Sequence, residues 1–392
     1  MTGTRSYEMA RRLIAAGHRV TMVCGSSDLN APSFGKLEKR VNDETIDGIN
    51  VRVIAEPYAN KMGFARRVLA FWRFAQTATQ VVRESEADLV FATSTPLTVG
   101  IPGMKGSRKL GAPFVFEVRD LWPEVPIAMG IVKNPLIKWY LQRLEKQIYF
   151  AAKHIVALSP GIREGVIRTG YPAAQTSMIP NAADTDLWLP STERSADPRF
   201  GPLEDTRFVF TGAHGLANGL DSVLDAAAEL KRRGARGVRF IFIGQGGQKD
   251  KLVARSNAEG LNDYCTWLPS MPKNELARLL PQLDVGLMIL QNLPAFYYGT
   301  SPNKFFDYIA SGIPVLNNYP GWLAGMIEEN RCGIVVPPDD PRAFADACLK
   351  FHERRGELKQ MGARGRALAE RDFSRDKLGA EFVKALEAAA PR

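Results

Sequence analysis

The stretch that decides the fold class is residues 299–316, GTSPNKFFDYIASGIPVL. It combines a polar loop, Pro302 near a predicted helix start, an amphipathic helix, Gly312 as a stop and a short apolar strand. Ser301 is a preferred N-cap residue, so we expect it to cap this helix. The pattern therefore predicts a loop–helix–strand unit of the α/β class.

The start of this predicted helix carries chemistry that suits a phosphate. Free backbone amides at a helix N-terminus attract anions, and Lys304 adds a positive charge in the first turn. Asp307 follows about one turn later and can accept hydrogen bonds from ribose hydroxyls. An ordinary capped helix with Lys304 and Asp307 in solvent explains the same residues equally well.

Short apolar strands alternate with amphipathic helices along the whole chain. In the first half we predict strands at 20–24, 51–54, 89–92, 114–117 and 155–158. In the second half we predict them at 208–211, 240–243, 285–290, 315–317 and 333–336. Such alternation indicates parallel sheets covered on both faces, and because it occurs twice it predicts two doubly wound domains.

The predicted domains are divided by a polar stretch. Residues 191–206 contain prolines, Gly201 and several charges, which is typical of a linker. We therefore expect a first domain at 1–190, a second at 207–372 and a final helix at 373–392.

The beginning of the chain departs from a doubly wound pattern. Such a domain starts with a strand, whereas here a turn, Thr2, Gly3 and Thr4, leads directly into a helix at 7–16. The expected first strand would be central in the usual strand order. We expect this strand to be encoded upstream of residue 1, and the alternative is an unusual sheet.

The amino-acid composition limits the kinds of protein and of binding partner that fit this chain. The 392 residues are 45% apolar and 24% charged, with 51 basic against 42 acidic residues. The net charge of +9 suits an anionic partner, and nucleic acid ranks last because the basic residues form no known reading motif. The four cysteines form no paired motif and there is no signal peptide or long apolar window, so we expect a reduced, cytoplasmic protein.

Residues 300–316 resemble the nucleotide-sugar signature of GT-4-type retaining glycosyltransferases. The resemblance is closest to the branch that includes the L-fucosamine transferases of bacterial surface polysaccharide assembly. Further segments match that branch in the same order along the chain: 119–124 (RDLWPE), 159–161 (SPG), 179–184 (IPNAAD), 211–215 (TGAHG), 219–221 (GLD), 242–247 (FIGQGG) and 268–269 (LP).

This resemblance implies a GT-B fold, in which two doubly wound Rossmann-like domains face a cleft. It implies that the first domain binds the acceptor, that the second binds the donor, and that the last helix returns to the first domain. The implied reaction is metal-independent and cofactor-free transfer with retention, from a UDP-sugar to an undecaprenyl-diphosphate-linked or other glycan.

The resemblance also implies roles for particular residues. The expected catalytic residues are Asp120, Glu124 and Lys304, with Asp120 binding a hydroxyl and Glu124 deprotonating the acceptor. The expected nucleotide-sugar contacts are Gly215, Gly244, Gly246, Gly247, Thr300, Ser301, Pro302, Asn303, Lys304 and Asp307. Simpler interpretations are a capping Asp120, a surface Glu124 and glycines that only shape tight turns.

Two segments differ from the pattern of many GT-4 enzymes. Gly299 stands where the first of two spaced acids is usual, and Asp307 takes the second position. His214 and Asn218 stand in the loop where an arginine and a lysine often meet the diphosphate. Lys304 and backbone amides would therefore neutralise more of the diphosphate charge.

Two further motifs have alternative interpretations. The pair Asp184 and Asp186 can hold a cation in other sugar transferases, but no further acid or histidine is nearby, so we expect a turn and no metal site. Residues 60–83 and 133–150 mix basic and aromatic side chains. They fit either core-facing helices with a solvated basic face or a peripheral contact with the inner face of the plasma membrane.

Two other functions fit the same sequence. A sugar-nucleotide 2-epimerase shares the GT-B architecture, although such an enzyme usually needs more cleft histidines and acids than this chain offers. A catalytically silent nucleotide-sugar-binding partner is the second alternative, because Gly299 replaces an acid.

Overall fold

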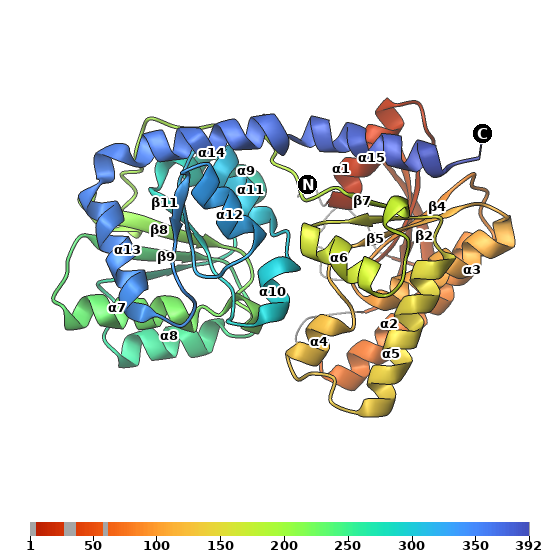
Figure 1. Ribbon diagram of the computed structural model, residues 1–392, viewed down its shortest axis with the longest axis horizontal. Helices are drawn as coiled ribbons and strands as arrows, with labels where there is room; N and C mark the ends of the chain where they lie inside the picture. Colours follow the sequence, from red (N-terminus) through yellow and green to blue (C-terminus); the bar gives the residue numbers. More distant parts are fainter. Residues whose placement is uncertain (1–4, 27–36, 58–61, 392) are drawn as a thin grey trace. The chain divides into compact units, whose positions relative to one another are not determined.

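The computed structural model describes residues 5–26, 37–57 and 62–391. The chain divides into two compact units (Figure 1). Unit 1 comprises Met1–Pro180, Gly299–Ser301 and Asp376–Arg392, and unit 2 comprises Asn181–Tyr298 and Pro302–Arg375. Unit 2 is built around one sheet and one apolar core, whereas unit 1 contains two sheets and two apolar clusters.

Unit 2 holds one parallel six-stranded sheet in the order β10-β9-β8-β11-β12-β13. In chain order this is the 3-2-1-4-5-6 arrangement of dinucleotide-binding folds. The core of this sheet includes the fully buried rings of Phe208, Phe210, Phe240 and Phe242. The strands are β8 (Thr206–Thr211), β9 (Val238–Ile243), β10 (Cys265–Leu268), β11 (Val285–Met288), β12 (Val315–Asn317) and β13 (Gly333–Val335).

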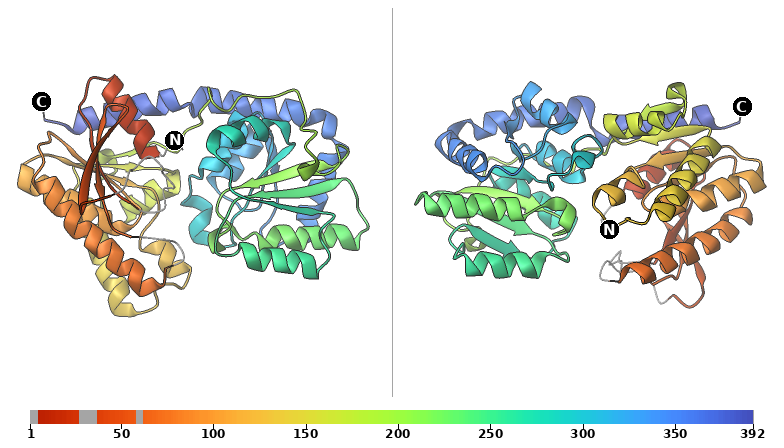
Figure 2. Two further views of the ribbon diagram at one scale, coloured as in Figure 1. Left: turned by 180° about the vertical axis from the view of Figure 1, so that it is seen from behind. Right: turned by 60° about the horizontal axis from the view of Figure 1, so that its bottom comes forward.

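The helices of unit 2 cover both faces of its sheet, as predicted for a doubly wound domain. Figures 1 and 2 show α7 and α8 along one face and α9, α11 and α12 along the other. These helices are α7 (Asp221–Arg232), α8 (Lys249–Ala258), α9 (Lys273–Leu279), α11 (Asn303–Ala310) and α12 (Trp322–Glu329). The remaining ones are α10 (Pro294–Tyr298), α13 (Pro341–Glu353) and α14 (Leu358–Asp372).

Unit 1 differs from the expected single sheet. It has a three-stranded sheet, β1-β3-β2, and a separate four-stranded sheet, β4-β5-β6-β7. β1 and β4 therefore each end a sheet, and the described residues provide no strand ahead of α1 to join them. The strands are β1 (Thr21–Gly25), β2 (Val41–Ile46), β3 (Ile49–Ile54), β4 (Val90–Thr93), β5 (Phe114–Val118), β6 (His154–Ala157) and β7 (Thr176–Met178).

The helices of unit 1 include one from the end of the chain. Its last helix, α15 (Arg375–Ala389), lies against this unit: the Phe382 and Phe91 rings are 5.2 Å apart, and Lys153 Nζ donates to Ala389 O at 2.9 Å. The other helices are α1 (Arg5–Ala15), α2 (Phe64–Arg83), α3 (Gly100–Leu110), α4 (Glu124–Ala128), α5 (Pro135–Ala151) and α6 (Pro160–Arg168).

A buried ion pair anchors α1 to the centre of unit 1. Arg5 Nε donates to Glu117 Oε2 at 2.8 Å, and both side chains are almost fully buried. The remaining guanidinium nitrogens donate to the carbonyls of Pro180 and Ile179 at 2.6 and 2.8 Å. Such a pair tolerates burial because every charged group has hydrogen-bond partners.

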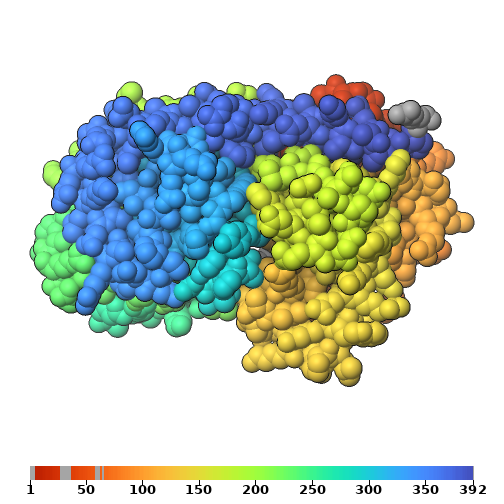
Figure 3. Space-filling model, viewed as in Figure 1, coloured from red at the N-terminus to blue at the C-terminus, as the bar shows by residue number. Residues whose placement is uncertain are grey.

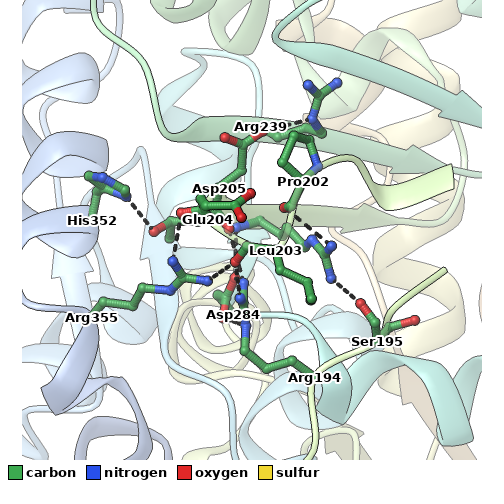
Figure 4. Close-up of polar contacts among 12 residues, drawn as sticks. Arg194, Ser195, Pro202, Leu203, Glu204, Asp205, Arg239, Asp284, His352 and Arg355 are labelled. Atoms are coloured by element: carbon green, nitrogen blue, oxygen red, sulfur yellow. Dashed lines mark hydrogen bonds and ion pairs between the residues drawn. The ribbon is translucent and has the colours of Figure 1, made fainter. Parts of the chain in front are cut away.

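The polar stretch 191–206 is not a free linker, because it belongs to unit 2 and is held there by arginines (Figure 4). Arg207 is fully buried and donates to the carbonyls of Ser195 and Gly201 at 2.5 and 2.7 Å. Arg194 forms two hydrogen bonds with Asp284, at 3.0 and 2.5 Å. The change of unit falls earlier, between Pro180 and Asn181.

No helix in the described part of the chain combines the length and apolar character needed to cross a membrane. All four cysteines are free thiols, as expected, and three of them are buried.

Removing the Asp284 charge should destabilise unit 2. Asp284→Asn leaves Arg194 and the buried arginine network without their carboxylate, at a cost of about 3 kcal/mol. The matched control is Asp263→Asn, because that carboxylate is 80% exposed and 3.8 Å from Arg236. Thermal unfolding followed by circular dichroism should show a clearly lower midpoint only for Asp284→Asn, and equal midpoints would contradict this role.

Candidate functional site

The centre of the unit 2 sheet has the strand order at which folds of this class bind ligands. β8 and β11 are neighbours there, with Phe208 paired to Val285. From β8 the chain continues to β9 on one side, and from β11 it continues to β12 on the other. Open α/β sheets bind ligands at the carboxyl ends of the strands where the order reverses in this way. The loops that follow β8 and β11 and the start of α11 lie at this position.

The loops after β8 and β9 are packed backbone to backbone. His214 N donates to Gln245 O at 2.9 Å, and Gln248 N donates to His214 O at 2.9 Å. A Cβ on Gly244 would lie 1.9 Å from Gly212 O, and one on Gly246 would lie 2.4 Å from His214 O. These two glycines are therefore required by loop packing.

The other two glycines of the predicted set have open surroundings. A Cβ on Gly215 or Gly247 would meet no atom within 4 Å. Of the four predicted glycine contacts, Gly215 and Gly247 are thus the positions with space for a ligand against the backbone.

The N-terminus of α11 differs from the predicted capping. The N-cap residue is Pro302, which makes no side-chain capping hydrogen bond, so Ser301 does not occupy the N-cap position expected for it. Ser301 is instead buried, and Gly299–Ser301 group with unit 1. Within unit 2 the predicted segment therefore contributes Pro302, an exposed Asn303, Lys304 and Asp307.

Lys304 contacts β8 and the loop that follows it. Its Nζ donates to Asn218 Oδ1 at 2.9 Å and lies 3.8 Å from the centre of the Phe210 ring. The Asn218 amide nitrogen donates to Ala213 O at 2.7 Å, which turns its oxygen toward the ammonium. Burial lowers the pKa of Lys304 to about 7, because no carboxylate among the described residues pairs with this ammonium to offset its desolvation.

One helical turn further, Tyr308 fixes α11 to the same strand. Thr211 N, at the end of β8, donates to Tyr308 Oη at 3.0 Å. Residues four apart share one helix face, so Tyr308 and Lys304 point to the same side of α11. The position of the ammonium is therefore set by two contacts with β8 and its loop.

His214 is a neutral, enclosed side chain beside this lysine. It is fully buried, and its ring lies 5.9 Å from Phe210 and 5.7 Å from Trp267 between ring centres. Neither ring nitrogen has a hydrogen-bond partner among the described residues. Burial lowers its pKa to about 4, helped by the charges of Lys249 and Lys304, so the imidazole is uncharged near neutral pH.

Lys249 was not singled out from the sequence. Its Nζ donates to Gly244 O at 2.8 Å and Leu268 O at 2.7 Å, so it ties the β9 loop to the end of β10. Burial lowers its pKa as well. The only sequence feature that points to Lys249 is its position at the start of the helix that follows a glycine-rich turn.

Asp307 lies in a cluster of charged residues. Burial raises its pKa to about 7, against the lowering effect of Lys273 and Arg375, and Asp184 raises it further. Lys273 Nζ is 3.1 Å from Asp184 Oδ2, so Asp184 is part of an ion pair. No cluster of three metal-ligating side chains exists within residues 5–26, 37–57 and 62–391.

The predicted acceptor residues lie at the carboxyl end of β5 in unit 1. Thr95 Oγ1 donates to Asp120 Oδ2 at 2.9 Å, which joins the loops after β4 and β5. Asp120 does not cap α4, whose N-cap is Pro123. Glu124 is exposed at the first position of α4, and its carboxylate is 3.2 Å from the Arg168 guanidinium.

Glu124 also lines a groove between α4, α5 and α6. This groove has a volume of about 850 Å³, and its lining includes Trp139, Arg143, Lys146 and Arg168. Glu145 lies in the same wall, where burial raises its pKa to about 7. The groove thus combines an aromatic ring with several cations.

The different surroundings of the glycines predict different effects of an added methyl group. Gly244→Ala places Cβ against Gly212 O, and the loop has to shift at a cost of about 1–3 kcal/mol. Gly247→Ala meets open space and should change the free energy of unfolding by less than about 0.5 kcal/mol. Chemical denaturation of the two variants measures the difference, and equal stabilities would show that the two loops do not pack as described.

Comparisons with known proteins agree with this architecture. A family model described as "Glycosyl transferase 4-like domain" matches residues 2–182, and one described as "Glycosyl transferases group 1" matches residues 205–354. The chain is 26% identical over 330 residues to the probable glycosyltransferase WbjE of Pseudomonas aeruginosa, covering 81% of this chain and 79% of that protein.

Solved structures share the fold. Sucrose-phosphate synthase from Thermosynechococcus elongatus superposes with a TM-score of 0.76 at 18% identity, covering 98% of this chain and 93% of that one. HepE from Anabaena, in complex with UDP-glucose, superposes with a TM-score of 0.61 at 15% identity, covering 86% of each chain. With its two matched domains and the sheet order of unit 2, this chain belongs to the GT-4-type glycosyltransferases of GT-B fold.

Proposed function

We propose that this glycosyltransferase uses a UDP-sugar donor, and that it transfers the sugar with retention to a polyprenyl-diphosphate-linked or other glycan acceptor in surface polysaccharide synthesis. An N-acetylated amino sugar is the transferred group we favour. The observation that carries the proposal is Lys304, at the reversal point of the unit 2 sheet, whose ammonium is paired with no carboxylate of residues 5–26, 37–57 and 62–391. The UDP-glucose complex of HepE, which has the same fold, supports this class of donor.

The donor diphosphate would offset the desolvation of Lys304. The ammonium has one amide oxygen and one aromatic face as neighbours, and neither carries a full negative charge. A diphosphate within hydrogen-bond distance supplies that charge in a site where water is scarce, so the attraction is stronger than at an exposed surface. The open backbone at Gly215 and Gly247 gives room for its oxygens.

The same contacts favour departure of the leaving group. As the bond between the sugar C1 and the diphosphate oxygen breaks, negative charge collects on that oxygen. Lys304 and the backbone amides at the start of α11 then stabilise the charge, and Asp307 binds the ribose hydroxyls. We assign the positive charge to Lys304 and not to a metal ion, so turnover should persist in a chelator.

The acceptor residues would act from unit 1. Asp120 binds an acceptor or donor hydroxyl while Thr95 holds its carboxylate in place. Glu124 takes the proton as the acceptor oxygen bonds to C1 on the face from which the diphosphate leaves. Its ion pair with Arg168 has to open at this step, which the exposure of both side chains permits.

Lys304→Met should weaken UDP binding by about 10- to 100-fold, because a charged hydrogen bond is lost. Isothermal titration calorimetry with UDP measures the dissociation constant. Lys251→Met is the matched control, since Lys251 is an exposed lysine in α8 of the same unit. An unchanged affinity for UDP in Lys304→Met would contradict the proposed donor site. Titration with GDP in place of UDP tests whether the protein distinguishes between nucleotide bases.

The same lysine should make UDP binding depend on pH. The pKa of Lys304 is lowered to about 7, so the free protein loses this positive charge as pH rises through that value. Affinity for UDP should then fall by up to about tenfold per unit between pH 7 and 9, with proton uptake on binding. Lys304→Met should lack this dependence, and a wild-type affinity that stays constant over this range would count against a role for Lys304.

Turnover itself separates the three candidate functions. Incubation with UDP-sugars and bacterial membranes should give a glycosylated lipid, and Glu124→Gln should slow this at least about 100-fold without changing UDP affinity. If the protein binds UDP but no product forms, the result would favour the catalytically silent binding partner. Formation of an epimerised sugar nucleotide without an acceptor would favour the epimerase.

A further inference from the structure

The groove between α4, α5 and α6 is a cavity of unit 1 that the proposed donor site does not use. Its volume of about 850 Å³ falls in the range of small-molecule binding sites, about 300–1,000 Å³. Figures 1 and 3 show these three helices next to one another at the surface of unit 1. Glu124, the proposed base, begins α4 and also lines the groove. A ligand in the groove would therefore be continuous with an acceptor whose hydroxyl lies at Glu124.

One face of α5 forms a wall of this groove. Leu144 and Ile148 are buried in the core of unit 1, on the opposite side of the helix. Residues three and four positions apart share one helix face, so the side chains that line the groove form a continuous stripe along α5. These side chains are Trp139, Gln142, Arg143, Lys146 and Gln147. The stripe is aromatic and polar.

Trp139 provides an aromatic surface in the groove. It is 61% exposed, and the guanidinium carbon of Arg143 lies 5.9 Å from the centre of its ring. The C–H faces of a sugar ring pack on aromatic rings, while the sugar hydroxyls form hydrogen bonds with amide and charged side chains. Gln142 and Gln147 offer amides of this kind. An exposed tryptophan among such polar groups therefore fits a saccharide.

The groove carries an excess of positive charge near neutral pH. Its lining contains Arg143, Lys146 and Arg168 against the carboxyl groups of Glu124 and Glu145. Arg168 is already paired with Glu124, at 3.2 Å. Burial raises the pKa of Glu145 to about 7, so this acid is partly protonated at neutral pH and cancels less of the positive charge. An anionic group on the ligand would therefore meet the cations of α5, Arg143 and Lys146.

We propose that this groove binds the part of the acceptor that lies beyond the reacting hydroxyl, and that this part is an anionic saccharide. Its ring would pack on Trp139, and its negative group would bind Arg143 and Lys146. That group is either the carboxylate of an acidic sugar or a phosphate attached to the sugar, because both present the oxygen pairs that arginine binds. The inference rests on the proposed function, since Glu124 is an acceptor base only if the chain transfers a sugar to a hydroxyl.

Titration of the full chain with three small sugars tests this class of ligand. The probes are glucuronic acid, glucosyl phosphate and glucose, and saturation-transfer NMR gives the dissociation constant of each. Saturating UDP is present throughout, so that the donor site is occupied. At least one anionic sugar should bind about fivefold more tightly than glucose, because it gains a charged hydrogen bond. The tighter anionic sugar then identifies the natural group as a carboxylate or a phosphate. Equal binding of all three sugars, or binding of none, would overturn the proposal.

Variants of α5 show whether the sugars bind in the groove. Trp139→Leu should weaken binding of the preferred anionic sugar about fivefold, because the aromatic surface under the sugar ring is lost. The pair Arg143→Gln, Lys146→Gln should abolish the preference for an anionic sugar over glucose, because the positive charge is lost. Anionic-sugar binding that keeps its wild-type strength in both variants would contradict a site in this groove.

Matched controls remove similar side chains elsewhere in unit 1. Tyr140→Leu removes an aromatic ring that is 57% exposed on α5 but is not among the residues that line the groove. Arg108→Gln with Lys109→Gln removes two exposed cations of α3. Both controls should bind the anionic sugar as the wild type does. Thermal unfolding followed by circular dichroism checks that every variant is folded.

A failure of the groove can be told apart from a failure of the proposed function. In turnover with bacterial membranes, Trp139→Leu should raise the KM for the acceptor and leave kcat within about twofold, because it removes binding made equally in the ground and transition states. Normal UDP affinity and turnover, with no effect of the α5 variants on sugar binding or KM, would overturn the groove site alone. Absence of UDP binding, with sugar binding that the α5 variants still weaken, would contradict the donor site and support the groove as a saccharide site.

Discussion

The site in unit 2 depends on a lysine ammonium held in a low-dielectric position, with no neutralising carboxylate in the part of the chain that the structure describes. Lys304 reaches the end of β8, where Asn218 and the Phe210 ring are its neighbours. Desolvating a cation costs free energy, and these neutral partners offset only part of that cost. The apolar core around Phe208 and Phe240 supplies the stability that keeps the lysine there. A bound anionic ligand would offset the remainder of this desolvation cost.

The backbone around the lysine is arranged before any ligand arrives. The β8 and β9 loops hold one another through hydrogen bonds at His214, and Gly244 and Gly246 permit the close approach. Lys249 binds the neighbouring carbonyls, so it contributes order to the loops. Such preorganised donors stabilise charge without reorganising during the reaction. The fold thus links the packing of two glycines to the chemistry proposed for Lys304.

Local patterns predicted most of the α/β architecture but not the contacts between distant segments. Apolar runs located β8, β9 and β11, because a strand buried on both faces is almost wholly apolar. The β2–β3 hairpin was missed, although Asp47 followed by Gly48, both with positive φ, is the turn signal that marks it. The stretch 191–206 has linker composition, and only the hydrogen bonds of Arg194 and Arg207 reveal that it is fixed to unit 2. When two residues that form a hydrogen bond lie 90 positions apart in the chain, as Arg194 and Asp284 do, no local sequence pattern reveals the contact.

The same limit applies to the site. Lys304 could be singled out as a candidate because a helix start with a nearby lysine is a local feature, whereas the surroundings of His214 and Asp307 come from segments far apart in the chain. The central claim is that Lys304 binds the donor diphosphate, and a crystal structure of the chain with UDP tests it most directly. The account predicts a phosphate oxygen within hydrogen-bond distance of Lys304 Nζ, at the carboxyl ends of β8 and β11. A nucleotide bound elsewhere, with Lys304 still on Asn218 alone, would contradict it.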